Sequence, residues 1–293
     1  MKRFQEEFAR WFFLLNGITV IFILVGIFVL LLRNSIPAFR EIEFLEFITG
    51  TEWNPTSYEK PAYGILAMMV STLMVTGGSL LISVPFGIAT AAYLAEVAGE
   101  RTREILKPAI EILAGVPSVV IGFFGIVVLG PFLAKLTGTT NGLNALNGSI
   151  LLGIMALPTV ISLSEDAISA VPDEYRRASL AMGANRWQTL IHVVLPAASS
   201  GIVASVMLGM GRAIGETMTV LMATGNAPAM PGSFLDSVRT MTATIAIELG
   251  EVPYNTTHYY ALFAVGLVLF LMTFVVNLAA DVILHRHQEV TRR

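Results

Sequence analysis

Residues 11–32 read WFFLLNGITVIFILVGIFVLLL, a run of 22 residues without a charged side chain. An apolar helix of about 20 residues crosses the roughly 30 Å of hydrocarbon in a bilayer. The run is longer than the apolar part of a secretory signal peptide, which holds about 7 to 15 residues, and no small-residue cleavage site follows it. The stretch therefore predicts a retained membrane-spanning helix.

The composition of the whole chain extends this prediction. Of its 293 residues, 55% are hydrophobic and 13% are charged, and the mean hydropathy is +0.72. So few charged side chains cannot cover the water-facing surface of a soluble protein of this length. The net charge of -3 argues against a nucleic-acid binder. The absence of cysteine excludes disulfides, thiolate metal sites and a cysteine nucleophile. We therefore expect an all-α integral membrane protein.

Six segments are apolar and long enough to span a membrane as helices. They lie at 11–32, 65–95, 109–133, 149–170, 197–224 and 258–284. The chain shows no internal repeat and no low-complexity tract. Residues 1–293 are therefore expected to form a single multi-pass transmembrane domain.

Basic residues between these segments set the orientation, because Lys and Arg concentrate in cytoplasmic connections. With the N-terminus inside, twelve basic residues are cytoplasmic, five are outside, and Arg212 lies within a span. The cytoplasmic set is Lys2, Arg3, Arg10, Arg101, Arg103, Lys107, Arg176, Arg177, Arg186, Arg286, Arg292 and Arg293. The outer set is Arg33, Arg40, Lys60, Lys135 and Arg239. Both termini are therefore predicted to be cytoplasmic.

Two long outer connections contain local signals. In the first, at 33–64, the run at 49–55 is typical of a turn. In the second, at 225–257, the apolar segment at 238–249 predicts a short helix at or within the membrane surface.

The cytoplasmic connection at 171–196 has the signals of two short helices. A proline followed by two acidic residues at 172–174 favours a helix start. Gly183 can adopt the left-handed conformation that ends a helix, and Asn185 with Gln188 resembles a capping box for a second helix. Such a knob is either a loop that covers the membrane domain or a docking element for a cytoplasmic partner.

The same connection resembles the EAA loop of ABC importer permeases, whose pattern is Glu-Ala-Ala, three residues, Gly, nine residues and Ile-x-Leu-Pro. The matching positions are 177–179, Gly183 and 193–196, with Arg177, Ser179 and Val193 departing from the family's residue types. In that family the loop helix sits in a cleft of a separate ATPase subunit. The resemblance implies a type I importer permease fold in the cytoplasmic (inner) membrane of a prokaryote. It also implies an ATPase-coupling surface that includes Glu174, Arg177, Ala178, Ser179 and Gly183.

Three further runs narrow the resemblance to the permeases of phosphate-specific ABC importers, the PstC family. They are PSVVIGFFG at 117–125, GRAIGETM at 211–218 and TEWNP at 51–55. This resemblance implies inorganic phosphate as the substrate, and a translocation pathway that includes Arg212, Glu216, Ser118 and Thr217. It also implies a second permease, two ATPase subunits that use ATP and Mg²⁺, and an extracytoplasmic phosphate-binding protein. No cofactor is expected on this chain itself.

Arg212 and Glu216 are also unusual on physical grounds. Their spacing of four predicts that they share one face of the fifth span. An ionisable residue at mid-bilayer costs about 2.5 to 3.5 kcal/mol on insertion scales, which argues against contact with lipid. One interpretation is an internal ion pair that fixes the helix register. The other is that Arg212 attracts a passing anion while Glu216 holds the guanidinium and limits how tightly the anion is retained.

Other signals in the spans are weaker. The run at 115–118 could break the third span or only kink it. Glu165 and Asp166 lie near the inner end of the fourth span and are expected to be solvated. The four histidines show no metal-site spacing.

The chain carries no G-x-x-x-x-G-K-[ST] motif, so ATP would have to be used by another subunit, and we expect a transport subunit rather than an enzyme. It also lacks the motifs of an intramembrane hydrolase. Two alternatives remain open. One is a permease for another oxyanion, such as sulfate or molybdate. The other is a stand-alone channel or secondary carrier, which should show inverted repeats and no docking loop.

Overall fold

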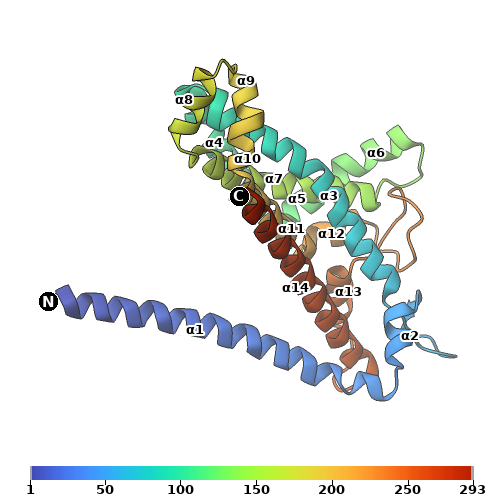
Figure 1. Cartoon of the computed structure of the whole chain (residues 1–293). Helices are drawn as coiled ribbons and strands as arrows, with labels where there is room; N and C mark the ends of the chain where they lie inside the picture. Colours follow the sequence, from blue (N-terminus) through green and yellow to red (C-terminus); the bar gives the residue numbers. More distant parts are fainter. Residues whose placement is uncertain (1, 292–293) are drawn as a thin grey trace.

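The computed structural model describes the backbone of residues 2–291 and the side chains of residues 6–279 and 282, so the outermost terminal basic residues and the histidines at 285 and 287 lie outside the described side chains. Within this range the chain is a helix bundle with one small hairpin (Figure 1). The long helices are α1 (Lys2–Ser35), α3 (Leu66–Ala92), α7 (Ala145–Ser169), α11 (Ser199–Gly215) and α14 (Thr257–Thr291).

The other elements are short. The helices are α2 (Phe44–Thr49), α4 (Glu100–Ala114), α5 (Ser118–Phe124), α6 (Gly130–Thr137), α8 (Asp173–Ala181), α9 (Arg186–Thr189), α10 (Leu195–Ala197), α12 (Met218–Ala223) and α13 (Met241–Glu248). Among the described residues the one 3-10 turn is η1 (Ala38–Arg40), and the π-helical turns are η2 (Tyr93–Val97), η3 (Gly125–Leu129) and η4 (Leu190–Val194). The strands β1 (Trp53–Asn54) and β2 (Ala62–Tyr63) pair antiparallel.

Five helical stretches among the described residues are long and apolar enough to cross a membrane. They are Glu6–Arg40, Leu66–Val97, Ser118–Thr137, Ala145–Ser169 and Thr257–Ala279. A sixth span is possible if Arg186–Ala197 and Ser199–Gly215, which meet at a bend of 68°, count as one. The expected all-helical, multi-pass fold is confirmed, while the bounds of the third and fifth spans differ from the prediction.

The third span begins later than the sequence predicted. The expected segment 109–133 overlaps both α4 and the helical stretch Ser118–Thr137, because the chain leaves the helical conformation between α4 and α5. Pro117 there has φ -60° and ψ 137°, an extended conformation. The proline therefore marks a true break, and α4 packs against α7 instead of continuing into the membrane span.

The centre of the bundle is built by α3, α7 and α11, which pack against one another. Small residues allow this close approach: a Cβ added at Gly87 would lie 2.7 Å from a methyl group of Val160, and one added at Gly209 would lie 3.0 Å from its other methyl group. Helices in a bilayer associate through such close packing rather than through a hydrophobic driving force. Val160 of α7 therefore packs closely against both α3 and α11.

Helix α1 leaves this bundle and crosses the lower part of Figure 1. Its end near residue 35 packs on α14, where the rings of Phe28 and Phe270 lie 5.7 Å apart. The large apolar side chains along the rest of α1 are exposed, for example Phe22 at 77%. In a membrane protein this surface is available to lipid or to another subunit.

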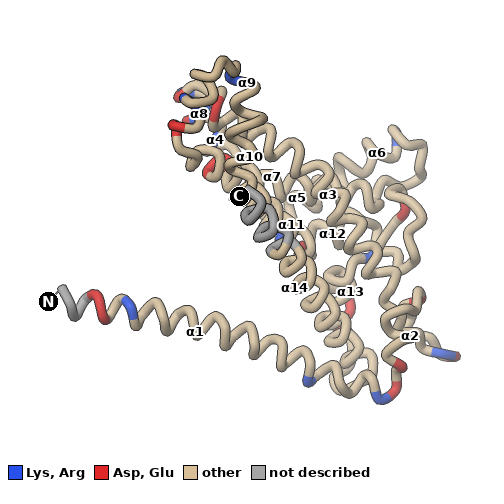
Figure 2. Tube along the Cα trace, in the orientation of Figure 1, with Lys and Arg blue, Asp and Glu red and all other residues tan. Residues whose placement is uncertain are grey.

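Charged residues gather at two ends of the molecule (Figure 2). One end is the knob formed by α8 and α9 together with α4, and the other holds α2 and the hairpin. The helices between them carry few charges, as expected for segments that cross hydrocarbon.

Candidate translocation site and coupling surface

The fifth expected span is interrupted at one of its own candidate residues. Helix α11 ends at Gly215, Glu216 is extended (φ -68°, ψ 134°), and α12 begins at Met218. The carboxylate of Glu216 accepts hydrogen bonds from the backbone N–H groups of Met218 (3.1 Å) and Thr219 (3.3 Å). The first N–H groups of a helix have no partner within it, so Glu216 stabilises the break. The prediction that Arg212 and Glu216 share one face of a continuous helix was therefore wrong.

Arg212 lies in the last turn of α11, and its side chain is exposed. Together with Glu216 it lines a narrow hollow, too small to hold a water molecule, whose other walls are Leu152, Met155, Ala156 and Ala213. None of the ion pairs in the described part of the chain joins Arg212 to Glu216. The hollow thus brings both charges to one place without pairing them.

Ser118 and Thr217 belong to the same neighbourhood. The hydroxyl of Thr219 donates to the carbonyl oxygen of Ser118 (3.1 Å), which fastens the start of α5 to the start of α12. The hydroxyl of Thr217 donates across the break to the carbonyl oxygen of the last residue of α11 (3.3 Å). All four candidate pathway residues therefore surround the break, with Arg212 one turn before it.

Sequence reasoning missed Thr242. Its hydroxyl donates to the carbonyl oxygen of Glu216 (2.9 Å), so the first turn of α13 is joined to the break. The expected short helix at 238–249 is confirmed as α13, although it begins at Met241. Threonines within an apolar segment were the available signal, and they do not reveal which distant backbone group the helix will meet.

The other end of α13 carries a second missed feature, which we call the outer hub: Trp53, Arg239, Glu248 and His258. The carboxylate of Glu248 accepts hydrogen bonds from Nε1 of Trp53 (3.0 and 3.1 Å) and Nη1 of Arg239 (2.9 Å), and it lies 2.8 Å from Nε2 of His258. The side chains of the three ionisable members are between 15% and 18% exposed. Helix α13 therefore connects the break directly with the outer surface.

The knob of α8 and α9 has the local structure that the sequence predicted. Gly183 adopts φ +89°, which is the left-handed conformation that ends a helix. Asn185 and Gln188 form a complete capping box at the start of α9. The two short helices and the glycine between them are thus confirmed.

The knob exposes a large apolar surface. Tyr175 is 55% exposed, Met182 is 88% exposed and Trp187 is 67% exposed. Of the candidate coupling residues, Glu174, Arg177, Ala178 and Gly183 are also exposed. The fifth, Ser179, is partly buried, and its hydroxyl lies 2.9 Å from that of Thr189, which ties α8 to the helix that follows. Aromatic side chains and methionine are enriched in the contact surfaces of protein interfaces.

The two neighbouring arginines of α8 have different environments. Arg176 points inward, where its guanidinium bonds to Glu96 (2.6 and 2.9 Å) and to the carbonyl oxygen of Ile168 (2.9 Å). Arg177 is exposed. Arg176 therefore anchors the knob to the bundle, and Arg177 belongs to its outward face.

The expectation that Glu165 is solvated was wrong. Its side chain is 1% exposed and is held by Arg103 and by Lys107, whose Nζ lies 2.6 Å from Oε2. The hydrogen bond to Glu165 raises the pKa of Lys107 above its ordinary value. Burial of the ammonium group opposes this shift to a smaller extent. A buried carboxylate requires such partners, and α4 supplies both. Asp166, at 65% exposure, is solvated as expected.

The model of the family described as binding-protein-dependent transport system inner membrane component matches residues 83–288. The probable ABC transporter permease YqgH of Bacillus subtilis is 41% identical over 230 residues, which are 78% of this chain and 74% of that protein. The phosphate transport system permease PstC of Mesorhizobium japonicum is 33% identical over 289 residues, covering 92% of this chain and 87% of that protein.

Two solved structures resemble the fold. A chain of a bacterial ABC transporter that imports the acidic polysaccharide alginate has a TM-score of 0.65 at 17% identity, covering 97% of this chain and 99% of that one. A chain of the methionine ABC transporter MetNI, in an inward-facing conformation, has a TM-score of 0.59 at 20% identity, covering 76% of this chain and 95% of that one. At these identities the likeness concerns the fold alone.

Proposed function

The chain belongs to the family of binding-protein-dependent transport system inner membrane components, and from this premise we propose that it is one of two permeases of an ATP-driven importer that carries inorganic phosphate into the cytoplasm. It is a multi-pass membrane protein with the fold of a type I ABC importer permease. The observation that carries the proposed substrate is the 33% identity, over 92% of this chain, to a permease named for phosphate transport.

Arg212 gives this proposal a physical basis. A guanidinium can donate two parallel hydrogen bonds to the oxygens of a phosphate. Arg212 is exposed on a membrane-embedded helix, and the nearby Gly215 has no neighbour within 4 Å of an added Cβ. A second permease packed against this open face would enclose the guanidinium in a polar path between the two subunits.

Glu216 acquires a different role from the one that its spacing suggested. Its carboxylate holds the break between α11 and α12 through two backbone N–H groups. Because Glu216 lies beside Arg212 along the same narrow hollow, its negative charge weakens the attraction of the Arg212 guanidinium for an anion. We therefore assign Glu216 two tasks: fixing the shape of the break and allowing the anion to leave.

The knob is the proposed attachment point of an ATPase subunit. Its exposed Tyr175, Met182 and Trp187 would provide the apolar centre of that interface, with Glu174 and Arg177 beside them. The proposed assembly holds this chain, a second permease, two ATPase subunits that use ATP and Mg²⁺, and an extracytoplasmic phosphate-binding protein. Closure of the ATPase subunits would push the knobs and rock the helices between outward and inward openings.

Uptake of radiolabelled phosphate by vesicles that contain the complete importer tests the substrate and the role of the break. The substitution Arg212→Gln should lower phosphate uptake by roughly tenfold or more, because a charged hydrogen-bond donor is lost. Glu216→Gln should also lower uptake, while Arg33→Gln, at the exposed end of α1, should leave it unchanged. Normal uptake by both the Arg212 and the Glu216 variants, with normal assembly, would contradict the proposal.

Competition by other oxyanions, and transport by the chain alone, separate the proposed function from its two alternatives. Unlabelled sulfate or molybdate should not reduce phosphate uptake, and strong competition by either would favour a permease for that oxyanion. Transport by the purified chain alone, without any ATPase subunit, would favour a stand-alone channel or carrier.

A further inference from the structure

A hairpin projects from the outer end of the molecule, beside α2 (Figures 1 and 2). Its strands pair Trp53 with Tyr63 and Asn54 with Ala62. The side chain of Tyr58, at the tip, is fully exposed at 105%. A tyrosine that the chain itself leaves entirely uncovered is unusual, because aromatic side chains gain most from burial.

The base of this hairpin is firmly held. Trp53 is only 5% exposed and donates to the Glu248 carboxylate of the outer hub. The backbones of Gly50 and Gly64 touch, since a Cβ added at Gly64 would lie 2.3 Å from the carbonyl carbon of Gly50. The tip is therefore presented on a rigid support, which lowers the entropy that a partner would have to remove on binding.

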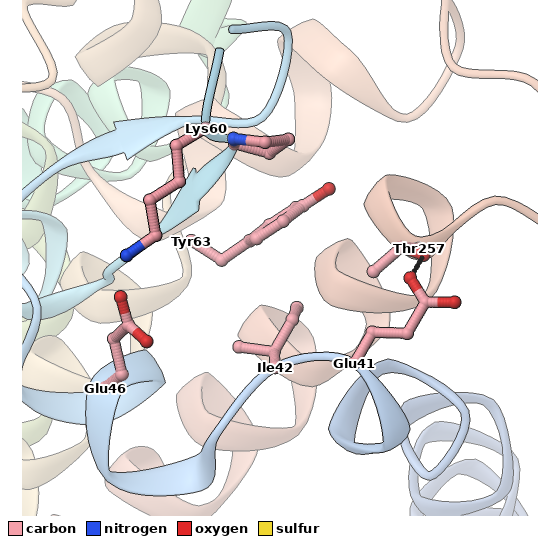
Figure 3. A pocket seen from close by; sticks show the side chains of 7 residues that line it. Glu41, Ile42, Glu46, Lys60, Tyr63 and Thr257 are labelled. Atoms are coloured by element: carbon pink, nitrogen blue, oxygen red, sulfur yellow. Dashed lines mark hydrogen bonds between the residues drawn. The ribbon is translucent and has the colours of Figure 1, made fainter. Parts of the chain in front are cut away.

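A hollow lies on each side of the hairpin. The first, of about 390 Å³, is lined by Glu41, Ile42, Glu46, Lys60, Pro61, Tyr63 and Thr257. In Figure 3 the Lys60 side chain extends toward Glu46, whereas Glu41 bonds to Thr257 at the opposite wall. Burial, and to a smaller extent Glu41, raises the pKa of the Tyr63 phenol above its ordinary value, so it stays neutral between these groups. With two carboxylates and one ammonium group, the first hollow is acidic.

The second hollow, of about 400 Å³, is lined by the other strand and by the outer hub. Its walls are Trp53, Asn54, Pro55, Thr56, Arg239, Glu248, Glu251, Val252, Pro253 and His258. The hairpin thus forms a ridge between two hollows, and an aromatic side chain stands at the end of the ridge. Protein interfaces have this form, with an aromatic anchor surrounded by polar contacts.

We propose that the hairpin Trp53–Tyr63 is the surface on which the extracytoplasmic binding protein docks, with Tyr58 as its anchor and the first hollow as the receptor for a basic side chain of that protein. The proposal rests on the proposed function, which supplies such a partner on this side of the membrane. A bilayer surface fits less well, because anionic lipid headgroups would be repelled by Glu41, Glu46 and the neighbouring Glu43 and Glu59.

Binding of the purified phosphate-loaded binding protein to the complete importer in lipid nanodiscs tests the anchor. Tyr58→Ala should raise Kd about tenfold or more, as truncation of an interface anchor does. The matched control is Tyr254→Ala, since Tyr254 is 80% exposed in another outer loop and lines neither hollow. An unchanged Kd for Tyr58→Ala would overturn the proposal.

The salt dependence of the same binding tests the acidic hollow. Glu46→Gln should weaken binding and flatten its dependence on ionic strength, because charge pairs across an interface are screened by salt. Glu43→Gln is the charge-matched control, since Glu43 lies next to the hollow without lining it. Equal effects of the two substitutions would show that the first hollow does not receive a basic side chain of the binding protein.

The solvent accessibility of the hairpin tip separates a surface that docks a protein from one that lies in the membrane. A nitroxide attached at Glu59→Cys, in a chain without other cysteines, should be relaxed by a water-soluble nickel complex. Relaxation by lipid-soluble oxygen instead would place the tip in the membrane and overturn the docking proposal. If the importer moved another anion and bound the corresponding binding protein through Tyr58, the proposed substrate would be wrong while the docking surface would stand.

Discussion

At the residue scale, Glu216 redirects a segment whose composition suits a continuous helix. The side chain competes with helical hydrogen bonding by accepting from the N–H groups of Met218 and Thr219. The hydroxyl of Thr242 then satisfies the carbonyl oxygen of Glu216 (2.9 Å). A single carboxylate with a distant threonine therefore places the break beside Arg212.

Gly183 is a second residue with a defined task, and it leads to a prediction. At φ +89° a side chain is strained, so Gly183→Ala should destabilise the joint between α8 and α9 by about 1 to 2 kcal/mol. We expect phosphate-stimulated ATP hydrolysis to continue while uptake per ATP falls, because the knob would no longer hold its shape against the ATPase. Parallel measurement of ATP hydrolysis and uptake checks this.

The matched control is Gly99→Ala. Gly99 has φ -69° and no atom within 4 Å of an added Cβ, so alanine fits there without strain. Unchanged coupling in Gly183→Ala, or an equal loss in Gly99→Ala, would contradict the role assigned to the joint.

At the element scale, α4 shows how a helix can be placed by charge. None of its residues is buried, so apolar burial contributes little to its position. Arg103 and Lys107 instead reach Glu165 of α7. The periodic pattern of α4 could not reveal this, because its partner lies 58 or more residues away.

Replacing Glu165→Gln should therefore loosen α4 while leaving the bundle folded. Arg103 and Lys107 are 43% and 33% exposed and can regain water. We accordingly expect the local opening free energy of α4 to fall by only about 1 kcal/mol. Hydrogen–deuterium exchange over residues 100–114 should then be several times faster than in the unsubstituted chain.

Asp166→Asn provides the comparison for this experiment. Asp166 is 65% exposed and lies 3.4 Å from Lys107, so its loss should leave exchange in α4 nearly unchanged. Equal exchange rates for Glu165→Gln and the unsubstituted chain would show that α4 is held by other contacts.

At the scale of the whole molecule, the charged knob and the hairpin lie at opposite ends of an apolar bundle (Figure 2). The hydrogen bonds of α13 link the outer end to the middle of the bundle, through Glu248 at one end of the helix and Thr242 at the other. The arrangement suits a subunit that receives one partner outside and another inside, with the anion path between them.

This arrangement predicts the labelling of single cysteines in intact cells. A membrane-impermeant maleimide should label Glu59→Cys at the hairpin without any treatment of the membrane. It should label Met182→Cys, at 88% exposure on the knob, only after the membrane is made permeable. The chain contains no cysteine, so each variant reports one position.

Labelling of Met182→Cys in sealed cells would reverse the orientation derived from the basic residues. The ATPase-docking role of the knob would then be wrong, whatever the substrate. Occlusion of Met182→Cys by the assembled ATPase subunits would agree with the proposed interface.

The sequence alone determined the features that depend on local composition and spacing. Runs of apolar residues determined the helical, membrane-embedded class and most of the spans. Gly183 and the Asn185–Gln188 pair determined the two-helix knob, because helix ends are set by residues within a few positions of each other. The motif spacings determined the family resemblance, which the family match confirmed.

Only the tertiary structure decided which distant groups meet. The link of the Glu216 break to Thr242, the burial of Glu165 and the outer hub each depend on residues that are far apart in the chain, as with Trp53 and Glu248, separated by 195 positions. A buried charge or an unpaired backbone group must find a partner wherever packing brings one. The hydrophobic periodicity of a single segment cannot identify that partner, because it indicates only which face of a helix is apolar.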